Sequence, residues 1–157
     1  MLAELHPTKR VQDAIDAFAE LHHSWPDTIL VVMGGGELQE KLQERIAYWN
    51  LSDRIFLLGF TPDGARYLKA PDLFLMPSRP EALGLALIEA GYAGLPSIAT
   101  RVGGMPEIIR HKETGLLVPS ENPHALARAI RLMLEHSEDA EKYGSELQKS
   151  VRDRFSK

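Results

Sequence analysis

Short apolar runs alternate along the chain with segments in which hydrophobic residues recur every three or four positions. The apolar runs predict β-strands, because they have the length and composition of buried strands. The predicted strands lie near residues 1–5, 28–33, 54–60, 73–76, 97–100 and 115–118. The other segments predict amphipathic helices. Val11, Ile15 and Phe18, for example, share one face of a helix that reaches about Leu21.

The alternation of strands and helices predicts an α/β fold. We expect a Rossmann-like parallel sheet of about six strands, with helices on both faces. The centre of this pattern is residues 72–100, which combine a strand, a Pro/Ser/Arg loop, a helix and a second strand in one βαβ unit. Gly94 and Pro96 end the helix before the second strand begins.

Candidate ligand-binding residues follow the ends of the predicted strands. Ligands of open parallel sheets bind beyond the carboxyl ends of the strands. The residues at those ends are Lys9, Gly34 to Gly36, Phe60, Glu81, Gly103 and Gly104. This coincidence favours a ligand of the nucleotide type.

Composition narrows the classes of function. The 157 residues, 44% hydrophobic and 25% charged, predict one globular domain. A net charge of −4 with both signs mixed argues against nucleic-acid and anionic-membrane partners. The chain has no cysteine, and its six histidines lack paired metal-ligand spacing, so we expect no disulfide and no metal site. No apolar run approaches the ~20 residues of a transmembrane segment, and no signal peptide is visible, which together predict a cytoplasmic protein.

Two glutamates bracket the loop and helix of the central unit. Glu81 lies in the loop, Glu89 lies in the helix, and seven residues separate them. Carboxylates placed in this way suit the hydroxyls of a sugar or ribose beside a phosphate at the helix N-terminus. The alternative is that both are surface residues that favour the helix dipole. Because Glu89 lies between Ile88 and Ala90 in a mostly apolar helix, we expect it to need a polar partner.

Several other motifs have both a structural and a functional interpretation. Gly84 either begins the helix or, lacking a Cβ, lets a diphosphate approach the amides of Gly84 and Leu85. The triple glycine at 34–36 lacks the G-x-G-x-x-G spacing of dinucleotide sites, so a tight turn is favoured. Lys9 and Arg10 are either phosphate ligands or solvated charges, and the segment 103–107 is interpreted as a structural turn.

Together these segments resemble a known enzyme family. Residues 77–130 read PSRPEALGLALIEAGYAGLPSIATRVGGMPEIIRHKETGLLVPSENPHALARAI. This string resembles the C-terminal half of retaining glycosyltransferases of family four, which have the GT-B fold, including their E-x-x-x-x-x-x-x-E motif. The upstream strings ELHPTKRVQDAIDAFAEL and VVMGGGEL resemble the lysine-bearing first loop and the second strand of that half.

The resemblance implies a nucleotide-diphosphate sugar as the substrate, with no cofactor and no bound metal. It implies that Glu81 is the catalytic residue that contacts the transferred sugar, and that Glu89 binds the ribose. Lys9 would neutralise the diphosphate. The other donor-binding positions that it implies are Leu83, Gly84, Leu85 and the backbone at Gly59 and Phe60. Many members carry an arginine in the first loop where this chain has Glu4, and Arg10 is the candidate substitute.

The resemblance also implies that residues 1–157 form a nucleotide-sugar-binding domain only. The N-terminal half of such enzymes binds the acceptor and closes over the donor, and that acceptor domain is absent from this sequence. Because closure aligns the acceptor and excludes water, we expect the isolated chain to bind nucleotide sugar weakly and not to transfer it.

Other interpretations stay open at this point. One is a different GT-B enzyme, such as a sugar-nucleotide epimerase or a phosphorylase. Another is a non-catalytic nucleotide-binding module or subunit that works with a separate acceptor domain. A dehydrogenase is disfavoured by the missing glycine fingerprint. The sequence leaves open the donor base, the sugar, the acceptor and the oligomeric state.

Overall fold

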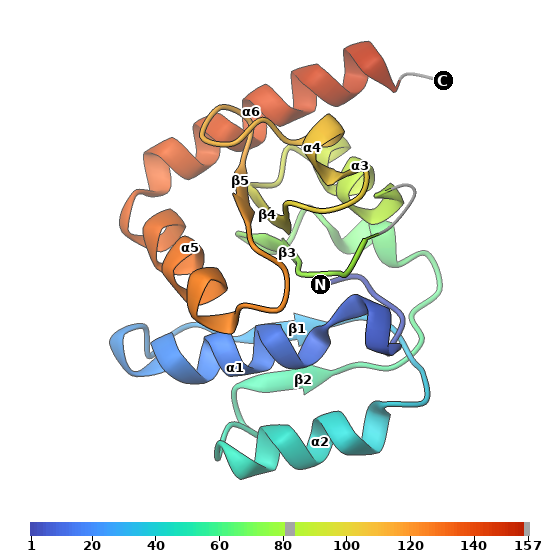
Figure 1. The fold of residues 1–157 in the computed structure, drawn as a ribbon, viewed down its shortest axis with the longest axis vertical. Helices are drawn as coiled ribbons and strands as arrows, with labels where there is room; N and C mark the ends of the chain where they lie inside the picture. Colours follow the sequence, from blue (N-terminus) through green and yellow to red (C-terminus); the bar gives the residue numbers. More distant parts are fainter. Residues whose placement is uncertain (81–83, 156–157) are drawn as a thin grey trace.

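A computed structural model describes residues 1–80 and 84–155 (Figure 1). The strands in this part of the chain are β1 (Leu30–Val32), β2 (Ile55–Leu57), β3 (Phe74–Met76), β4 (Ser97–Thr100) and β5 (Leu116–Val118). The helices are α1 (Val11–Leu21), α2 (Gln39–Tyr48), α3 (Leu85–Tyr92), α4 (Met105–Ile108), α5 (Pro123–Glu135) and α6 (Ser137–Arg154). Three short 3₁₀ helices are η1 (Pro7–Lys9), η2 (His22–Ser24) and η3 (Gly64–Tyr67). The predicted α/β class is confirmed.

All strand pairs are parallel, but they form two sheets. One sheet has the order β3-β4-β5, with Leu75 opposite Ile98 and Ile98 opposite Leu116. The other contains β1 and β2, with Val31 opposite Phe56. The prediction of about six strands is therefore one too high for the described residues, which contain five.

The missing strand is the predicted one at residues 1–5. This segment runs alongside the end of β1 and the residues after it. The Ala3 amide donates to the Met33 carbonyl at 3.0 Å, and the Leu5 amide donates to the Gly35 carbonyl at 3.0 Å. Among the residues that the structure describes, however, the segment completes a bridge only between Leu2 and Met33. On its other side the segment makes no backbone hydrogen bond to β3 within the described residues. A segment bonded on one side at a single bridge does not form a strand ladder.

The β3-β4-β5 sheet separates two hydrophobic clusters. Successive residues of a strand point to opposite faces, so Leu75 joins one cluster while Phe74 and Met76 join the other. The first cluster packs under α1, α2 and α5, and the second packs under α3, α4 and α6. Burial on both faces explains why β3, β4 and β5 are continuous apolar runs rather than alternating ones.

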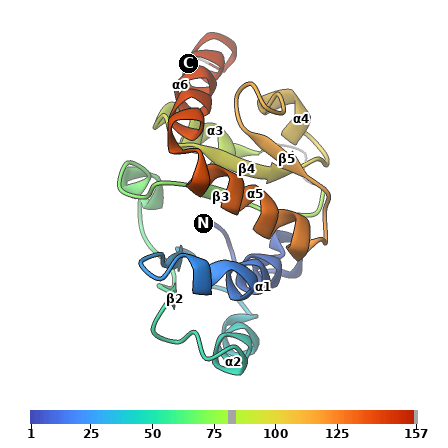
Figure 2. The ribbon, with the colours of Figure 1, turned by 90° about the vertical axis from the view of Figure 1, so that its left-hand side faces the viewer.

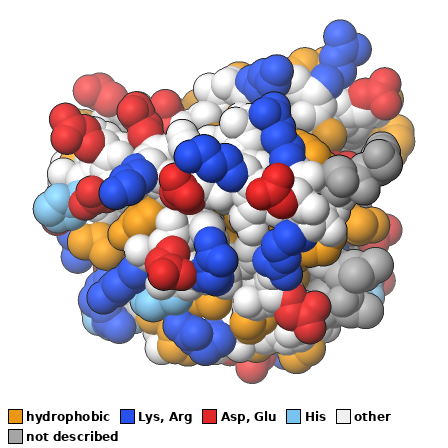
Figure 3. All heavy atoms as spheres, turned by 90° about the horizontal axis from the view of Figure 1, so that it is seen from above, with side chains coloured by type: hydrophobic (Ala, Val, Ile, Leu, Met, Phe, Trp, Pro, Cys, Tyr) orange, Lys and Arg blue, Asp and Glu red, His pale blue; other side chains and the backbone are white. Residues whose placement is uncertain are grey.

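The long C-terminal helix α6 covers α3 (Figure 2). Their close approach depends on glycine. A Cβ at Gly91 would meet Val151 at 2.9 Å, and one at Gly144 would lie 2.4 Å from the Gly94 carbonyl oxygen. Positive and negative side chains are interspersed on the face seen from the α6 end (Figure 3). Within residues 1–80 and 84–155, no helix is both long and apolar enough to cross a bilayer.

Candidate functional site

A pocket of about 360 Å³ opens at the carboxyl edge between residues 1–5 and β3. It lies where the backbone ladder is interrupted. Three of the predicted site residues meet here, namely Lys9, Leu85 and Glu89. The full lining is Met1, Leu2, Ala3, Glu4, Lys9, Leu75, Met76, Ser78, Leu85, Ala86 and Glu89. Its size and its mixture of apolar walls with a few polar groups are typical of small-ligand sites.

Helix α3 forms one wall of the pocket. The first-turn amides of a helix have no intrahelical partner and mark the positive end of its dipole. In α3 the N-cap residue Gly84 gives them no side-chain hydrogen bond. Leu85 and Glu89 are four residues apart and therefore share the face that borders the pocket. Glu89 is exposed on this face, while Leu87 and Ile88 are buried on the other side. The expectation that the apolar helix would leave Glu89 in need of a polar partner is therefore wrong, because the helix buries one face only.

Gly84 has a packing role that the sequence did not indicate. A Cβ on Gly84 would lie 2.9 Å from the Ile108 side chain and 3.0 Å from the Met105 sulfur atom. The missing side chain therefore makes room for α4. Residues 85 and 86, and not Gly84, line the pocket. The contact of a diphosphate with the Gly84 amide stays a prediction.

The charges in the pocket are mixed. Among the described lining residues, Lys9 is positive, whereas Glu4 and Glu89 are negative. Lys9 ends η1, directly after the turn that residues 6–8 make. Glu4 occupies the position at which the family resemblance leads one to expect arginine, so the carboxylate opposes the binding of a diphosphate. Sequence reasoning noted Glu4 only as a departure from the family pattern and did not place it at the pocket.

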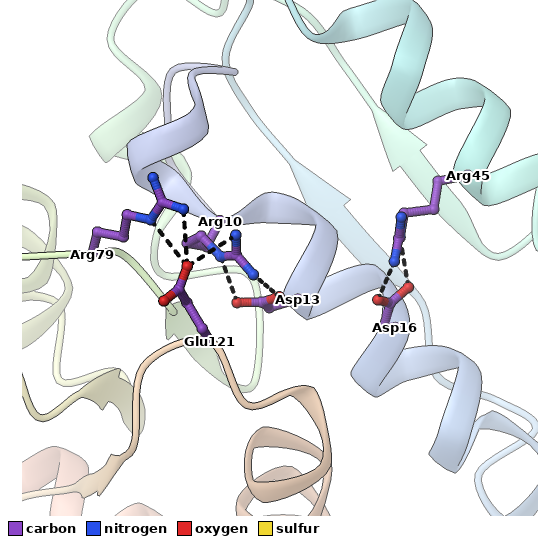
Figure 4. A network of polar contacts seen from close by, with 6 residues as sticks. All are labelled: Arg10, Asp13, Asp16, Arg45, Arg79 and Glu121. Carbon is purple, nitrogen blue, oxygen red and sulfur yellow. Dashed lines mark hydrogen bonds and ion pairs between the residues drawn. The ribbon is translucent and has the colours of Figure 1, made fainter.

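Arg10 lies elsewhere. Its guanidinium donates two hydrogen bonds of 2.9 Å to the carboxylate of Asp13 and forms an ion pair of 3.3 Å with Glu121 (Figure 4). The hydrogen bond to Asp13, which is buried, raises the pKa of Arg10. Arg10 is not among the residues that line the pocket. Its guanidinium therefore joins α1 to the loop before α5, and a direct role on phosphate has no support in this placement.

Gly59 and Phe60 follow β2, farther along the same edge. The Gly59 carbonyl accepts a 2.8 Å hydrogen bond from the Gly34 amide, and Gly35 packs against the Phe60 backbone. The triple glycine is thus a close turn next to the predicted base-binding backbone. The Phe60 side chain is 82% exposed. Neither Gly59 nor Phe60 lines the pocket, and their contact with a base stays a prediction.

Glu81 and Leu83 lie outside the described residues, but the loop that precedes them is held on two sides. The Thr100 hydroxyl donates to the Ser78 carbonyl at 2.6 Å, and the Arg79 amide donates to the Thr8 carbonyl at 2.8 Å. Ser78 is buried and lines the pocket, a role that sequence reasoning missed. The expectation that ligands bind beyond the carboxyl ends of strands, which selected Glu81, applies to Ser78 as well.

A second hollow of about 490 Å³ lies between α1, the end of α2 and the start of α5. Its acidic residues are already engaged. Asp16 accepts from Arg45 and Trp49, and Glu20 contacts His124 at 2.5 Å. None of the predicted donor-binding residues that the structure describes lines this hollow, so the smaller pocket, where three of them meet, is the better candidate for the donor.

Comparison with known proteins identifies the family. The family described as "Glycosyl transferases group 1" matches residues 1–150. The chain belongs to this family. N-acetyl-alpha-D-glucosaminyl L-malate synthase from Bacillus anthracis is 34% identical over 154 residues, which are 98% of this chain and 40% of that enzyme. This group 1 glycosyltransferase chain thus spans about two-fifths of the length of that relative.

Solved structures agree with this result. The chain superposes on Anabaena Alr3699/HepE, solved in complex with UDP, with a TM-score of 0.92 and 28% identity, over 98% of this chain and 43% of that chain. It also matches the C-terminal domain of the group 1 protein LpcC from Francisella tularensis (TM-score 0.90, 24% identity), over 98% of this chain and 84% of that chain, a likeness of fold alone. The predicted resemblance and the fold of one GT-B half are confirmed.

Proposed function

We propose that this group 1 glycosyltransferase chain is the donor-binding half of a retaining enzyme that transfers a sugar from a nucleotide-diphosphate sugar. The observation that carries the proposal is the pocket in which Lys9, the N-terminus of α3 and Glu89 meet at the carboxyl edge. A relative with the same fold binds UDP, which supports a nucleotide of this kind.

The pocket suggests how the parts of the donor are held. The diphosphate lies near Lys9 and the first-turn amides of α3, where positive charge and free N–H groups favour an anion. Glu89 accepts hydrogen bonds from the ribose hydroxyls on the exposed face of α3. The backbone at Gly59 and Phe60 faces the base farther along the edge. Glu81 contacts the transferred sugar.

These groups also suit the departure of the diphosphate. As the bond between the anomeric carbon and the diphosphate breaks, negative charge grows on the leaving oxygen. Lys9 and the helix N-terminus stabilise that charge without a metal ion. The acceptor oxygen attacks from the face that the diphosphate leaves, and its proton passes to the departing phosphate, so that the anomeric configuration is retained.

The first test is calorimetric titration of the chain with UDP, GDP and ADP and then with their sugars. We expect weak binding of at least one nucleotide and no sugar transfer to added acceptors, because one half of the cleft can neither align an acceptor nor exclude water. A chain that binds none of the three nucleotides, or one that transfers sugar at the rate of a full-length enzyme, would contradict the proposal.

Glu4→Gln tests the electrostatics of the pocket. Removing this carboxylate should strengthen the binding of UDP by roughly threefold to tenfold, because one repulsion of the diphosphate is lost. The matched control is Glu138→Gln on the exposed start of α6, which makes the same charge change far from the pocket. Titration at low and high salt should show the gain in the Glu4 variant shrinking as salt screens it. Equal effects of the two variants would contradict the assignment.

A further inference from the structure

Three loops at the carboxyl edge meet at one carboxylate. Oε1 of Glu121 accepts from both the Nε and the Nη2 atoms of Arg79, at 3.2 and 2.9 Å, and lies 3.3 Å from Nη1 of Arg10 (Figure 4). Arg10 is the N-cap residue that precedes α1, Arg79 follows β3, and Glu121 lies between β5 and α5. We name this arrangement of Arg10, Arg79 and Glu121 the Glu121 clamp.

The clamp residues are direct neighbours of the pocket walls. Arg10 follows Lys9, and Arg79 follows Ser78, both of which line the pocket. The backbone joins the same two segments, since the Arg79 amide donates to the Thr8 carbonyl at 2.8 Å. Glu121 itself lies outside the pocket lining. It borders the larger hollow instead, so its effect on a ligand in the smaller pocket passes through the residues that it holds.

Two of the three clamp residues have a strained backbone conformation. Arg10 and Glu121 both adopt left-handed conformations, with φ of 52° and 55°. Glycine adopts this region more readily than residues with a Cβ. Glycine at either position would relieve the backbone but would remove the side chain that forms the ion pair between Arg10 and Glu121. The backbone conformation therefore disfavours Arg10 and Glu121, whereas the ion pair requires their side chains.

The clamp residues are only partly shielded from water. The side chains of Glu121 and Arg79 are 50% and 47% exposed, and that of Arg10 is 17% exposed. The hydrogen bond from Arg79, with the charges of Arg79 and Arg10, lowers the pKa of Glu121, so this carboxylate is ionised near neutral pH. Exposed ion pairs contribute little to global stability, so an effect on ligand binding can be separated from an effect on folding.

We propose that Glu121 is a positioning residue, which holds the Lys9 and Ser78 walls of the pocket in register for the donor diphosphate. The inference rests on the proposed function of that pocket. It assigns to the loop between β5 and α5 a part in donor binding that is indirect, through Arg10 and Arg79.

The test is Glu121→Gly, which removes the clamp and at the same time relieves the left-handed backbone. UDP affinity, measured by calorimetry, should fall roughly threefold to tenfold. The melting temperature should stay level or rise, because glycine fits this φ. Asn50→Gly is the matched control, since Asn50 also has a left-handed φ of 57° but lies at the end of α2, away from the pocket. That variant should leave UDP affinity unchanged.

A double variant tests whether the effect passes through the pocket wall. If Glu121 acts by placing Lys9, then Glu121→Gly should cost little further affinity in a Lys9→Ala background. Amide exchange of Arg79 should also quicken in Glu121→Gly without any ligand. Unchanged UDP affinity in Glu121→Gly would overturn the clamp, and an equal loss in both backgrounds would overturn its action through Lys9. Failure of the unaltered chain to bind UDP, GDP or ADP would overturn the clamp and the proposed function together.

Discussion

Replacing Gly34 with alanine is expected to destabilise the fold by about 4 kcal/mol or more, a loss that approaches the whole stability of a small domain. An ideal Cβ on Gly34 would lie 1.8 Å from the carbonyl oxygen of Ala3 and 2.7 Å from its carbonyl carbon. Both atoms belong to the backbone, so no rotamer change can relieve the clash. The φ of 148° is a further obstacle to any residue with a side chain.

The expected damage is the separation of residues 1–5 from β1. The hydrogen bond from the Ala3 amide to the Met33 carbonyl lies beside Gly34 and would break. Urea unfolding, followed by circular dichroism, measures the loss. Gly59→Ala is the matched control: its φ is 76°, but a Cβ there meets nothing within 4 Å. The control should lose only about 1–2 kcal/mol from the left-handed backbone. If Gly34→Ala and Gly59→Ala lose the same free energy of unfolding, then the contact with the Ala3 carbonyl is not what requires glycine at position 34.

Replacing Glu89 with alanine is expected to weaken the binding of UDP, GDP and ADP by a similar factor, roughly 10-fold to 100-fold, as loss of a charged hydrogen-bond acceptor does. The ribose is common to all three nucleotides, and for that reason the base should not matter. Glu89 is exposed on the pocket face of α3, so the melting temperature should change little. Calorimetry with the three nucleotides measures the effect, and Glu135→Ala at the exposed end of α5 is the control.

Glu81→Ala supplies the contrast for this experiment. Because Glu81 is proposed to contact the transferred sugar, its loss should weaken the binding of nucleotide sugars and leave free nucleotides unaffected. If neither glutamate variant changes any affinity, then the assignment of the two carboxylates is wrong. If Glu89→Ala discriminates strongly among bases, then Glu89 contacts the base and not the ribose.

The order of strands and helices could be predicted from the sequence because it depends on local patterns. Hydrophobic spacing places α1, and apolar runs bounded by Gly and Pro place β3 and β4. Residues 1–5 have the composition of a strand as well. Strand assignment, however, also requires partners, and this segment completes only one bridge. The composition of a segment does not reveal whether neighbouring strands form hydrogen bonds with it on one edge or on both.

The site was predictable only in part, because side-chain direction and long-range contacts are tertiary properties. Lys9 was selected by its place at a strand end and Glu89 by its place in the helix of the central unit, and both line one pocket. Sequence reasoning could not show that Gly84 is required by Met105 and Ile108 of α4. It also could not show that Arg10 faces Glu121, since no local pattern relates the start of α1 to the loop before α5.

The interrupted ladder between residues 1–5 and β3 has a mechanical consequence. The two sheets are held together there by side chains and by the packing of α1 on α5, without a continuous row of backbone bonds. The pocket at this gap is lined by residues 1–4 on one side and by Leu75 and Met76 of β3 on the other. If the proposed donor binds there, we expect its binding energy to restrict the orientation of one sheet relative to the other.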